Sequence, residues 1–126
     1  MIALDSSALI AFLAGAKTPI ADAVESAFEQ EHACLPPVVL AEVLSDPGLD
    51  SDVAILLKTL PRLEILDGYW ERAGDLRRAV LKRSLRARLA DTLIAQSCID
   101  HHVALVTGDR DFRHFERHGL IVITGK

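Results

Sequence analysis

The stretch Val103-Ala104-Leu105-Val106-Thr107-Gly108-Asp109 joins a short apolar run to a glycine and an acid. An apolar run of this length, bounded by turn residues, is typical of a strand that is buried on both faces of a parallel sheet. The glycine lets the chain turn tightly after the strand. Because ligands gather at the carboxyl ends of strands in open parallel sheets, the acid is expected at a functional edge.

The same pattern opens the chain, where Ile2-Ala3-Leu4 runs directly into Asp5. Strands are expected at residues 2–4, 32–35, 63–66, 103–106 and 120–123. Helices are expected at residues 7–13, 20–31, 38–44, 52–60, 69–86, 90–101 and 111–117, with Asp67 capping the long fifth helix. Five short strands separated by helices predict an α/β fold with a parallel sheet covered on both faces.

Length and composition favour one folded domain over residues 1–126. Hydrophobic residues make up 50% of the chain, enough to bury a core, and no apolar run reaches the roughly 18 residues that a membrane span needs. The amino terminus lacks the basic start of a signal peptide, so a cytoplasmic protein is expected. Cys34 and Cys98 lie in apolar segments and are expected to be free core thiols.

Four acids stand in settings that offer no evident local partner: Asp5, Glu42, Asp91 and Asp109. Glu42 lies among apolar residues of a short helix, which suggests that it faces a cleft. Carboxylates brought together repel one another, and a hard divalent cation removes that repulsion. Magnesium prefers oxygen ligands and polarises phosphate groups, so the acids point towards phosphate-ester chemistry.

Structural alternatives exist for each acid taken alone. Asp5 and Asp91 could each cap the helix that follows, and for Asp91 this is the favoured interpretation in isolation. Glu42 could pair with an arginine, and Asp109 and Asp111 could be ordinary turn residues. The functional interpretation depends on the four acids taken together on this sheet plan.

Basic residues partly offset the formal net charge of −4, which is unusual for a protein that binds nucleic acid. A basic segment precedes Asp91, comprising Arg72, Arg77, Arg78, Lys82, Arg83, Arg86 and Arg88, and Arg110 and Arg113 flank Asp109. We expect Arg86, Arg88 and Arg110 to contact phosphates, although they could equally bind the acidic tail of a partner. His114 and His118, four residues apart, are expected to share a helix face at the surface rather than bind zinc.

Four motifs, in order, resemble the PIN-domain ribonucleases. They are Ile2-Ala3-Leu4-Asp5-Ser6-Ser7-Ala8-Leu9-Ile10, Leu40-Ala41-Glu42-Val43, Leu89-Ala90-Asp91-Thr92-Leu93-Ile94-Ala95 and Leu105-Val106-Thr107-Gly108-Asp109-Arg110-Asp111-Phe112. The resemblance spans the whole chain. The length of the chain and the order of its four motifs are similar to those of the VapC toxins of toxin–antitoxin pairs. No single motif is specific, whereas the ordered set of four is.

The resemblance implies a three-layer α/β/α sandwich with strand order 3-2-1-4-5. It implies a metal-dependent endoribonuclease, in which Asp5, Glu42, Asp91 and Asp109 hold Mg²⁺ or Mn²⁺ and a metal-activated water hydrolyses the RNA phosphodiester. Ser7 and Thr107 would be supporting hydroxyls, and Asp111 matches a less constant fifth acid. A homodimer and a small antitoxin that occludes the site are also implied.

Two other enzyme classes share a similar sheet, but their motifs are not met in this sequence. A haloacid-type phosphatase would need a second acid where Ser7 stands, and a receiver domain would need a lysine after the last strand, where only the terminal Lys126 is found. A non-catalytic module, which binds metal and RNA or a protein without cleaving anything, stays open as the alternative function.

Overall fold

The structure is a computed structural model that describes residues 1–125. Lys126, the terminal lysine considered for a receiver domain, lies outside the described residues. Within the described part, the strands are β1 (Ile2–Leu4), β2 (Ala33–Cys34), β3 (Ala104–Val106) and β4 (Val122–Ile123). The helices are α1 (Ser6–Leu13), α2 (Pro19–Glu29), α3 (Pro37–Leu44), α4 (Ser51–Thr59), α5 (Tyr69–Lys82), α6 (Leu89–His101) and the 3₁₀ helix η1 (Arg110–His118).

The strands form one parallel sheet in the order β2-β1-β3-β4. In the two central strands, Ile2 pairs with Ala104 and Leu4 pairs with Val106. This register places the residues that follow, Asp5 and Thr107, side by side at the carboxyl edge. The expected α/β class is therefore confirmed, and the adjacent central strands β1 and β3 join segments that are about one hundred residues apart in the sequence.

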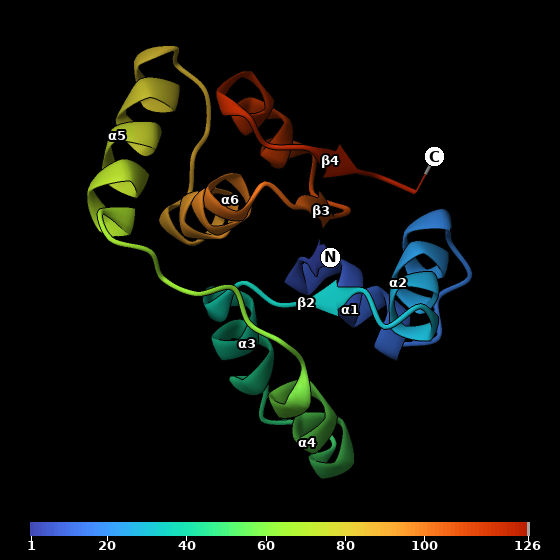
Figure 1. Cartoon of the computed structure of the whole chain (residues 1–126). Coiled ribbons are helices and arrows are strands. Elements are labelled where there is room, and N and C mark those ends of the chain that lie inside the picture. The colour runs from blue at the N-terminus through green and yellow to red at the C-terminus, as the bar shows by residue number, and fades with distance from the viewer. Residues whose placement is uncertain (126) are drawn as a thin grey trace.

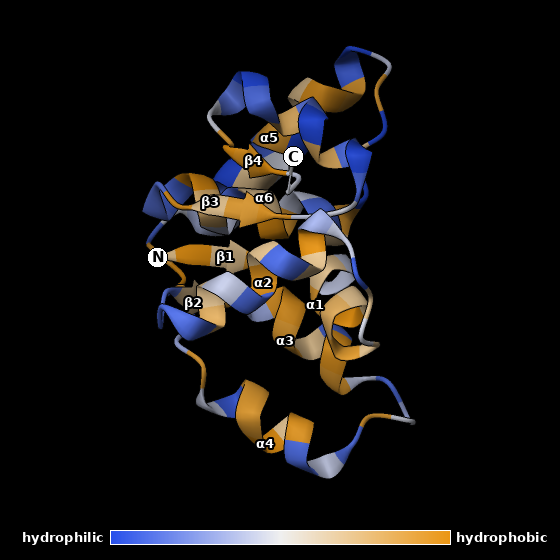
Figure 2. Ribbon diagram, turned by 90° about the vertical axis from the view of Figure 1, so that its right-hand side faces the viewer, coloured by the Kyte–Doolittle hydropathy of each residue, from blue (hydrophilic) through white to orange (hydrophobic). Residues whose placement is uncertain are grey.

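Helices cover both faces of the sheet, with α1 and α2 on one face and α5 and α6 on the other (Figure 1). The turned view in Figure 2 shows the apolar strands stacked between these helices, with α4 farthest from the sheet. Leu4, Leu105 and Val106 are buried in the strands, and Phe112 and Phe115 are buried from η1. Cys34 and Cys98 are free and buried, as expected.

The expected third strand at residues 63–66 is wrong, and the strand count is four rather than five among residues 1–125. In its place, a single parallel bridge joins Leu35 to Arg62, with Leu35 N–H donating to Pro61 C=O and Leu63 N–H donating to Leu35 C=O. Pro61 has no N–H to extend a ladder. Ile65 and Leu66 are 44% and 37% exposed, so this segment lacks the burial that holds an edge strand in place.

Two helix predictions also need correction. The long helix α5 ends at Lys82 rather than at residue 86, and Ser84 then adopts a left-handed φ of 59°. Arg86 and Arg88 therefore lie in the connection to α6. Asp67 does not cap α5, because Gly68 occupies the N-cap position with a φ of 81° and no side-chain cap forms. Within the described chain, no helix has both the length and the apolarity to cross a membrane.

Candidate functional site at the carboxyl edge of the sheet

Asp5 stands directly after β1 and is 3% exposed. It occupies the N-cap position of α1, but its side chain makes no capping hydrogen bond. Instead, Ser7 Oγ and Thr107 Oγ1 each donate to Asp5 Oδ2 at 2.7 Å. The capping alternative for Asp5 is therefore wrong, and both hydrogen bonds end on one oxygen of the carboxylate.

The turn after β3 is tied to the same carboxylate. Thr107 Oγ1 also accepts a hydrogen bond from the Asp109 N–H at 3.0 Å, and Ser7 Oγ accepts one from the Gly108 N–H at 3.2 Å. Asp109 Oδ1 in turn accepts from the Asp111 N–H at 2.9 Å, so Asp109 caps η1 rather than serving only as a turn residue. One carboxylate oxygen of Asp109 is thus occupied by a hydrogen bond from the backbone.

Asp91 is the third residue of α6, whose N-cap position is held by Arg88. The N-cap alternative for Asp91 is therefore wrong. Its Oδ2 atom is buried and has no hydrogen-bond partner among the described residues. A buried carboxylate oxygen without a partner is unfavourable unless a cation or a donor compensates it.

Burial, followed by the nearby negative charges of Asp109, Asp5 and Glu42, raises the pKa of the Asp91 carboxyl from 3.8 to about 6, against the opposing charge of Arg88. The four acids are thus within electrostatic reach of one another around Asp91.

Glu42 lies on α3 and is exposed. Its Oε1 atom accepts a hydrogen bond from Ser6 Oγ at 3.1 Å, which links α3 to the start of α1. It forms no ion pair with an arginine within residues 1–125, contrary to the structural alternative. The side chain lines a pocket between α1 and the turn after α3, although it is not shielded from water as the sequence suggested.

The acids do not form a closed ligand shell. No group of three or more acidic, histidine or cysteine side chains in the described chain is close enough to hold a metal ion. Like-charge repulsion opposes a closer approach. The donor set is nevertheless all oxygen, which suits a hard divalent cation, and the unpartnered Asp91 Oδ2 is an atom that such a cation would satisfy.

The three arginines singled out from the sequence have different surroundings. Arg86 lies 3.8 Å from Asp111 Oδ2, which gives Asp111 a partner at the edge of the site. Arg88 is exposed at the start of α6, where its charge opposes the rise in the Asp91 pKa. Arg110 is exposed and lines a pocket beside Asp109. The structure therefore distributes these cations around the rim of the acidic edge.

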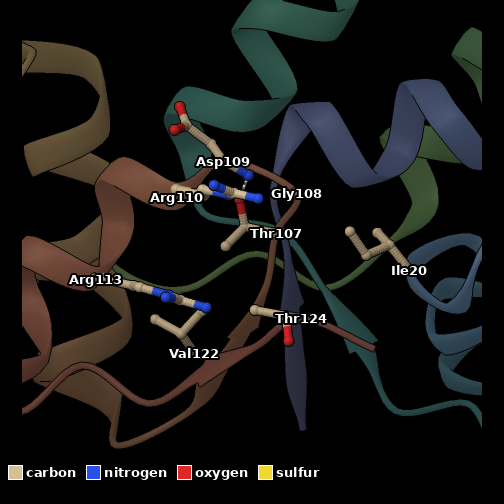
Figure 3. Close-up of a pocket in the computed structure, with 8 residues that line it drawn as sticks. All are labelled: Ile20, Thr107, Gly108, Asp109, Arg110, Arg113, Val122 and Thr124. Carbon is tan, nitrogen blue, oxygen red and sulfur yellow. Dashed lines mark hydrogen bonds between the residues drawn. The ribbon is translucent and has the colours of Figure 1, made fainter. Parts of the chain in front are cut away.

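Residues that the sequence did not single out complete this rim. Ser6 holds Glu42, and Ile20 and Thr124 line the pocket beside Asp109 together with the two flanking arginines, Arg110 and Arg113 (Figure 3). The residues of this pocket come from α2, from the turn after β3 and the start of η1, and from β4 and the residue that follows it, and α2 is far from the others in the sequence. No sequence pattern could group them, since only the sheet order brings these segments together.

The prediction that His114 and His118 share a helix face is wrong. His114 and His118 lie on η1, a 3₁₀ helix with three residues per turn, so a spacing of four does not place them on one face. The His114 Nδ1 atom is hydrogen-bonded to the Arg86 carbonyl at 2.8 Å.

The fold and the site define a class of α/β protein with a parallel sheet and an acid-lined carboxyl edge. This chain belongs to the PIN domain family, which matches residues 2–118. The sequence has no match among curated proteins.

Solved structures share this fold over nearly the whole chain. A chain of VapBC2 from Rickettsia felis bound to a DNA fragment from their promoter is 22% identical, with a TM-score of 0.73 over 98% of both chains. A chain of FitAB bound to an IR36 DNA fragment is 15% identical, with a TM-score of 0.71 over 98% of this chain and 94% of that one. FitAcB from Neisseria gonorrhoeae is 16% identical, with a TM-score of 0.70 over 99% and 98%.

Proposed function

We propose that this chain is a divalent-metal-dependent endoribonuclease and the toxin component of a toxin–antitoxin pair, as in VapC. Membership of the PIN domain family and the likeness to chains of VapBC2 and FitAB support this proposal. The observation that carries it is the buried, unpartnered Asp91 Oδ2, because Asp109, Asp5 and Glu42 add their negative charges around it. Such an arrangement is unfavourable without a cation.

Asp5, Asp91 and Asp109 would hold Mg²⁺ or Mn²⁺, with Glu42 binding directly or through a water molecule. A cation held by these acids polarises a phosphodiester and lowers the pKa of a water molecule. Ser7 and Thr107 fix the orientation of Asp5 by donating to its Oδ2 atom, which leaves Oδ1 available. A carboxylate of the site would take the proton from the attacking water.

The rim cations would hold the RNA backbone. Arg88 and Arg110 are exposed beside Asp91 and Asp109, and Arg86 adds a third guanidinium near Asp111. Local positive charge is needed because the chain as a whole has a formal charge of −4 and would repel RNA. The expected cellular location is the cytoplasm, where such RNA is found.

The partner that we propose is an antitoxin covering the pocket between α1 and the turn after α3, which has both apolar and acidic lining residues. Ile10 and Leu13 of α1 are 59% and 39% exposed there, and Glu42 of the acidic edge lines the same pocket. A segment bound in this pocket would therefore reach the acids. We also propose a homodimer, supported by the exposed Leu81 and Leu89, which line one pocket together.

The test is cleavage of total cellular RNA by purified, antitoxin-free protein in Mg²⁺ or in EDTA. Asp5→Asn is compared with the wild type, and Asp52→Asn, an exposed acid in the first turn of α4, is the matched control. We expect discrete products with the wild type and with Asp52→Asn in Mg²⁺ only, and none with Asp5→Asn. A folded wild type that cleaves no RNA would instead favour the non-catalytic binding module.

A further inference from the structure

A pocket of about 390 Å³ lies on the β4 side of the acidic edge (Figure 3). We call it the β4-side pocket, and its lining residues are Ile20, Thr107, Gly108, Asp109, Arg110, Arg113, Val122 and Thr124. Thr107 and Asp109 belong to both the pocket and the acidic edge. Whatever enters this pocket therefore lies directly beside the place where chemistry is proposed.

The two arginines of the pocket lie on one face of η1. Residues three apart eclipse each other in a 3₁₀ helix, so Arg110 and Arg113 project in the same direction. Phe112 and Phe115 form the buried face of the same helix. Arg117 is exposed but is not part of the pocket lining.

Neither arginine of the pocket is neutralised by an acid. Within residues 1–125, Arg72 pairs with Asp100 and Arg86 lies near Asp111, whereas Arg110 and Arg113 form no ion pair. The carboxylate of Asp109 points away from Val122 and Thr124 in Figure 3, and its Oδ1 atom is held by the Asp111 N–H. The pocket therefore offers two free guanidinium groups to an anion.

The remaining walls differ in character from the arginines. Ile20 and Val122 provide apolar surface, and Thr124 adds a hydroxyl that can donate and accept a hydrogen bond. A pocket that combines apolar walls with a few polar groups is typical of small-ligand sites. A nucleotide has these properties, with an anionic phosphate, an apolar base face and a polar base edge.

We propose that the β4-side pocket binds one nucleotide of single-stranded RNA, adjacent to the phosphodiester at the acidic edge. Arg110 and Arg113 hold the phosphate of this nucleotide, its base lies against Ile20 and Val122, and Thr124 contacts the base edge. Single-stranded RNA is required, because a base must leave its stack to enter the pocket. This inference rests on the proposed function in taking RNA as the ligand.

Binding of fluorescent single-stranded RNA oligonucleotides to the full chain, in EDTA so that no cleavage intervenes, tests the proposal. Arg110→Ala and Arg113→Ala should each weaken binding by about tenfold and reduce the slope of log K against log salt by about 0.7, one phosphate contact each. Arg117→Ala, on the same helix but outside the pocket, is the matched control and should change neither. Arg113→Lys should retain the salt slope, because it keeps the charge.

A second measurement tests the base contact. Homopolymeric oligonucleotides of the four bases should bind the wild type with unequal affinities, and Thr124→Val should reduce that difference. The threonine and valine side chains are close in shape, so the fold should be preserved. Equal loss of affinity for all four bases in Thr124→Val would contradict the base contact.

The outcomes separate this proposal from the nuclease itself. If the wild type cleaves RNA but both arginine variants bind RNA as the wild type does, the pocket proposal is overturned and the nuclease stands. If RNA binding depends on the two arginines but no RNA is cleaved, the nuclease proposal is contradicted and the nucleotide pocket is supported. If both variants retain RNA binding but lose binding to an acidic protein partner, the pocket is a protein site and the proposal is wrong.

Discussion

Thr107 and Asp5 lie 102 residues apart in the sequence and are joined by a hydrogen bond of 2.7 Å from Thr107 Oγ1 to Asp5 Oδ2. The same hydroxyl accepts from the Asp109 N–H at 3.0 Å. One side chain therefore connects the acid after β1 with the acid after β3. The backbone pairing of β1 with β3 sets the two strand ends side by side, and this hydroxyl adds a side-chain link between them.

Thr107→Val should lower both stability and cleavage. It removes the hydroxyl while keeping the shape, which deprives the buried Asp5 carboxylate and the Asp109 N–H of a partner and should reduce the free energy of unfolding by about 1–3 kcal/mol. Loss of an outer support of this kind should reduce cleavage by about 10- to 100-fold. Urea unfolding and RNA cleavage assays check the two effects. Thr107→Ser, which keeps the hydroxyl, should retain most of the stability and most of the cleavage. If Thr107→Ser lost as much stability and cleavage as Thr107→Val, the explanation would be contradicted.

The free energy of unfolding should depend on pH because Asp91 ionises at a different pH in the folded and unfolded states. Its pKa is about 6 in the folded chain and 3.8 ordinarily, so between these values the folded state binds more protons than the unfolded state. Stability contributed by protonated Asp91 is therefore lost as the pH rises from about 4 to above 6. Asp91→Asn should stabilise the metal-free protein by about 1 kcal/mol at pH 7, a value discounted because the side chain is only partly buried. Unfolding curves in EDTA at pH 5 and pH 7 provide the check; equal gains at both pH values would argue against this origin.

Magnesium should raise the melting temperature, because the proposed cation site exists at the folded acidic edge and not in the unfolded chain. At a concentration one hundred times its dissociation constant, a bound ligand adds about 2.7 kcal/mol. Differential scanning fluorimetry with increasing Mg²⁺ measures the shift. The shift should disappear in Asp91→Asn and persist in Asp52→Asn. A shift of equal size in both variants would place the ion away from Asp91.

Gly125→Ala should disturb the wall of the β4-side pocket. Gly125 has a φ of 80°, and a Cβ atom there would lie 2.6 Å from the Pro19 carbonyl oxygen and 2.7 Å from the Ile20 nitrogen. Both strain and overlap with backbone atoms would displace Thr124 from Ile20, at an expected loss of about 1–3 kcal/mol. Thermal unfolding and oligonucleotide binding check this. Gly74→Ala, where a Cβ would meet nothing within 4 Å, is the control and should be neutral or slightly stabilising.

Much of the fold follows from local pattern. Central strands buried on both faces need continuous apolar residues, and Ile2–Leu4 and Ala104–Val106 show this directly. The seven helices were expected within a few residues of their observed bounds, except at the end of α5. Prediction failed where stability comes from pairing rather than composition, as at residues 63–66, whose apolar side chains find no neighbouring ladder.

The acidic site could be predicted in its members but not in its contacts. The acids Asp5 and Asp109 follow strands, and this position is visible in the sequence because strand ends are local features. The 3₁₀ geometry of η1, which separates His114 from His118, was not visible in the sequence, and neither was the pocket that places Arg110 and Arg113 opposite Ile20 and Thr124. Helix type depends on how Phe112 and Phe115 fit the core, which is a tertiary property.

By itself, the sequence determined that this protein has an α/β fold and which acids stand at its strand ends, because hydrophobic burial and turn chemistry act over a few residues. Only the tertiary structure decided that Thr107 donates to Asp5, that Asp91 keeps a buried oxygen without a partner, and that Ile20 and Thr124 face Arg113 across a pocket. Such contacts join residues whose separation along the chain carries no information about their distance, and they form only when the sheet order places β1 beside β3.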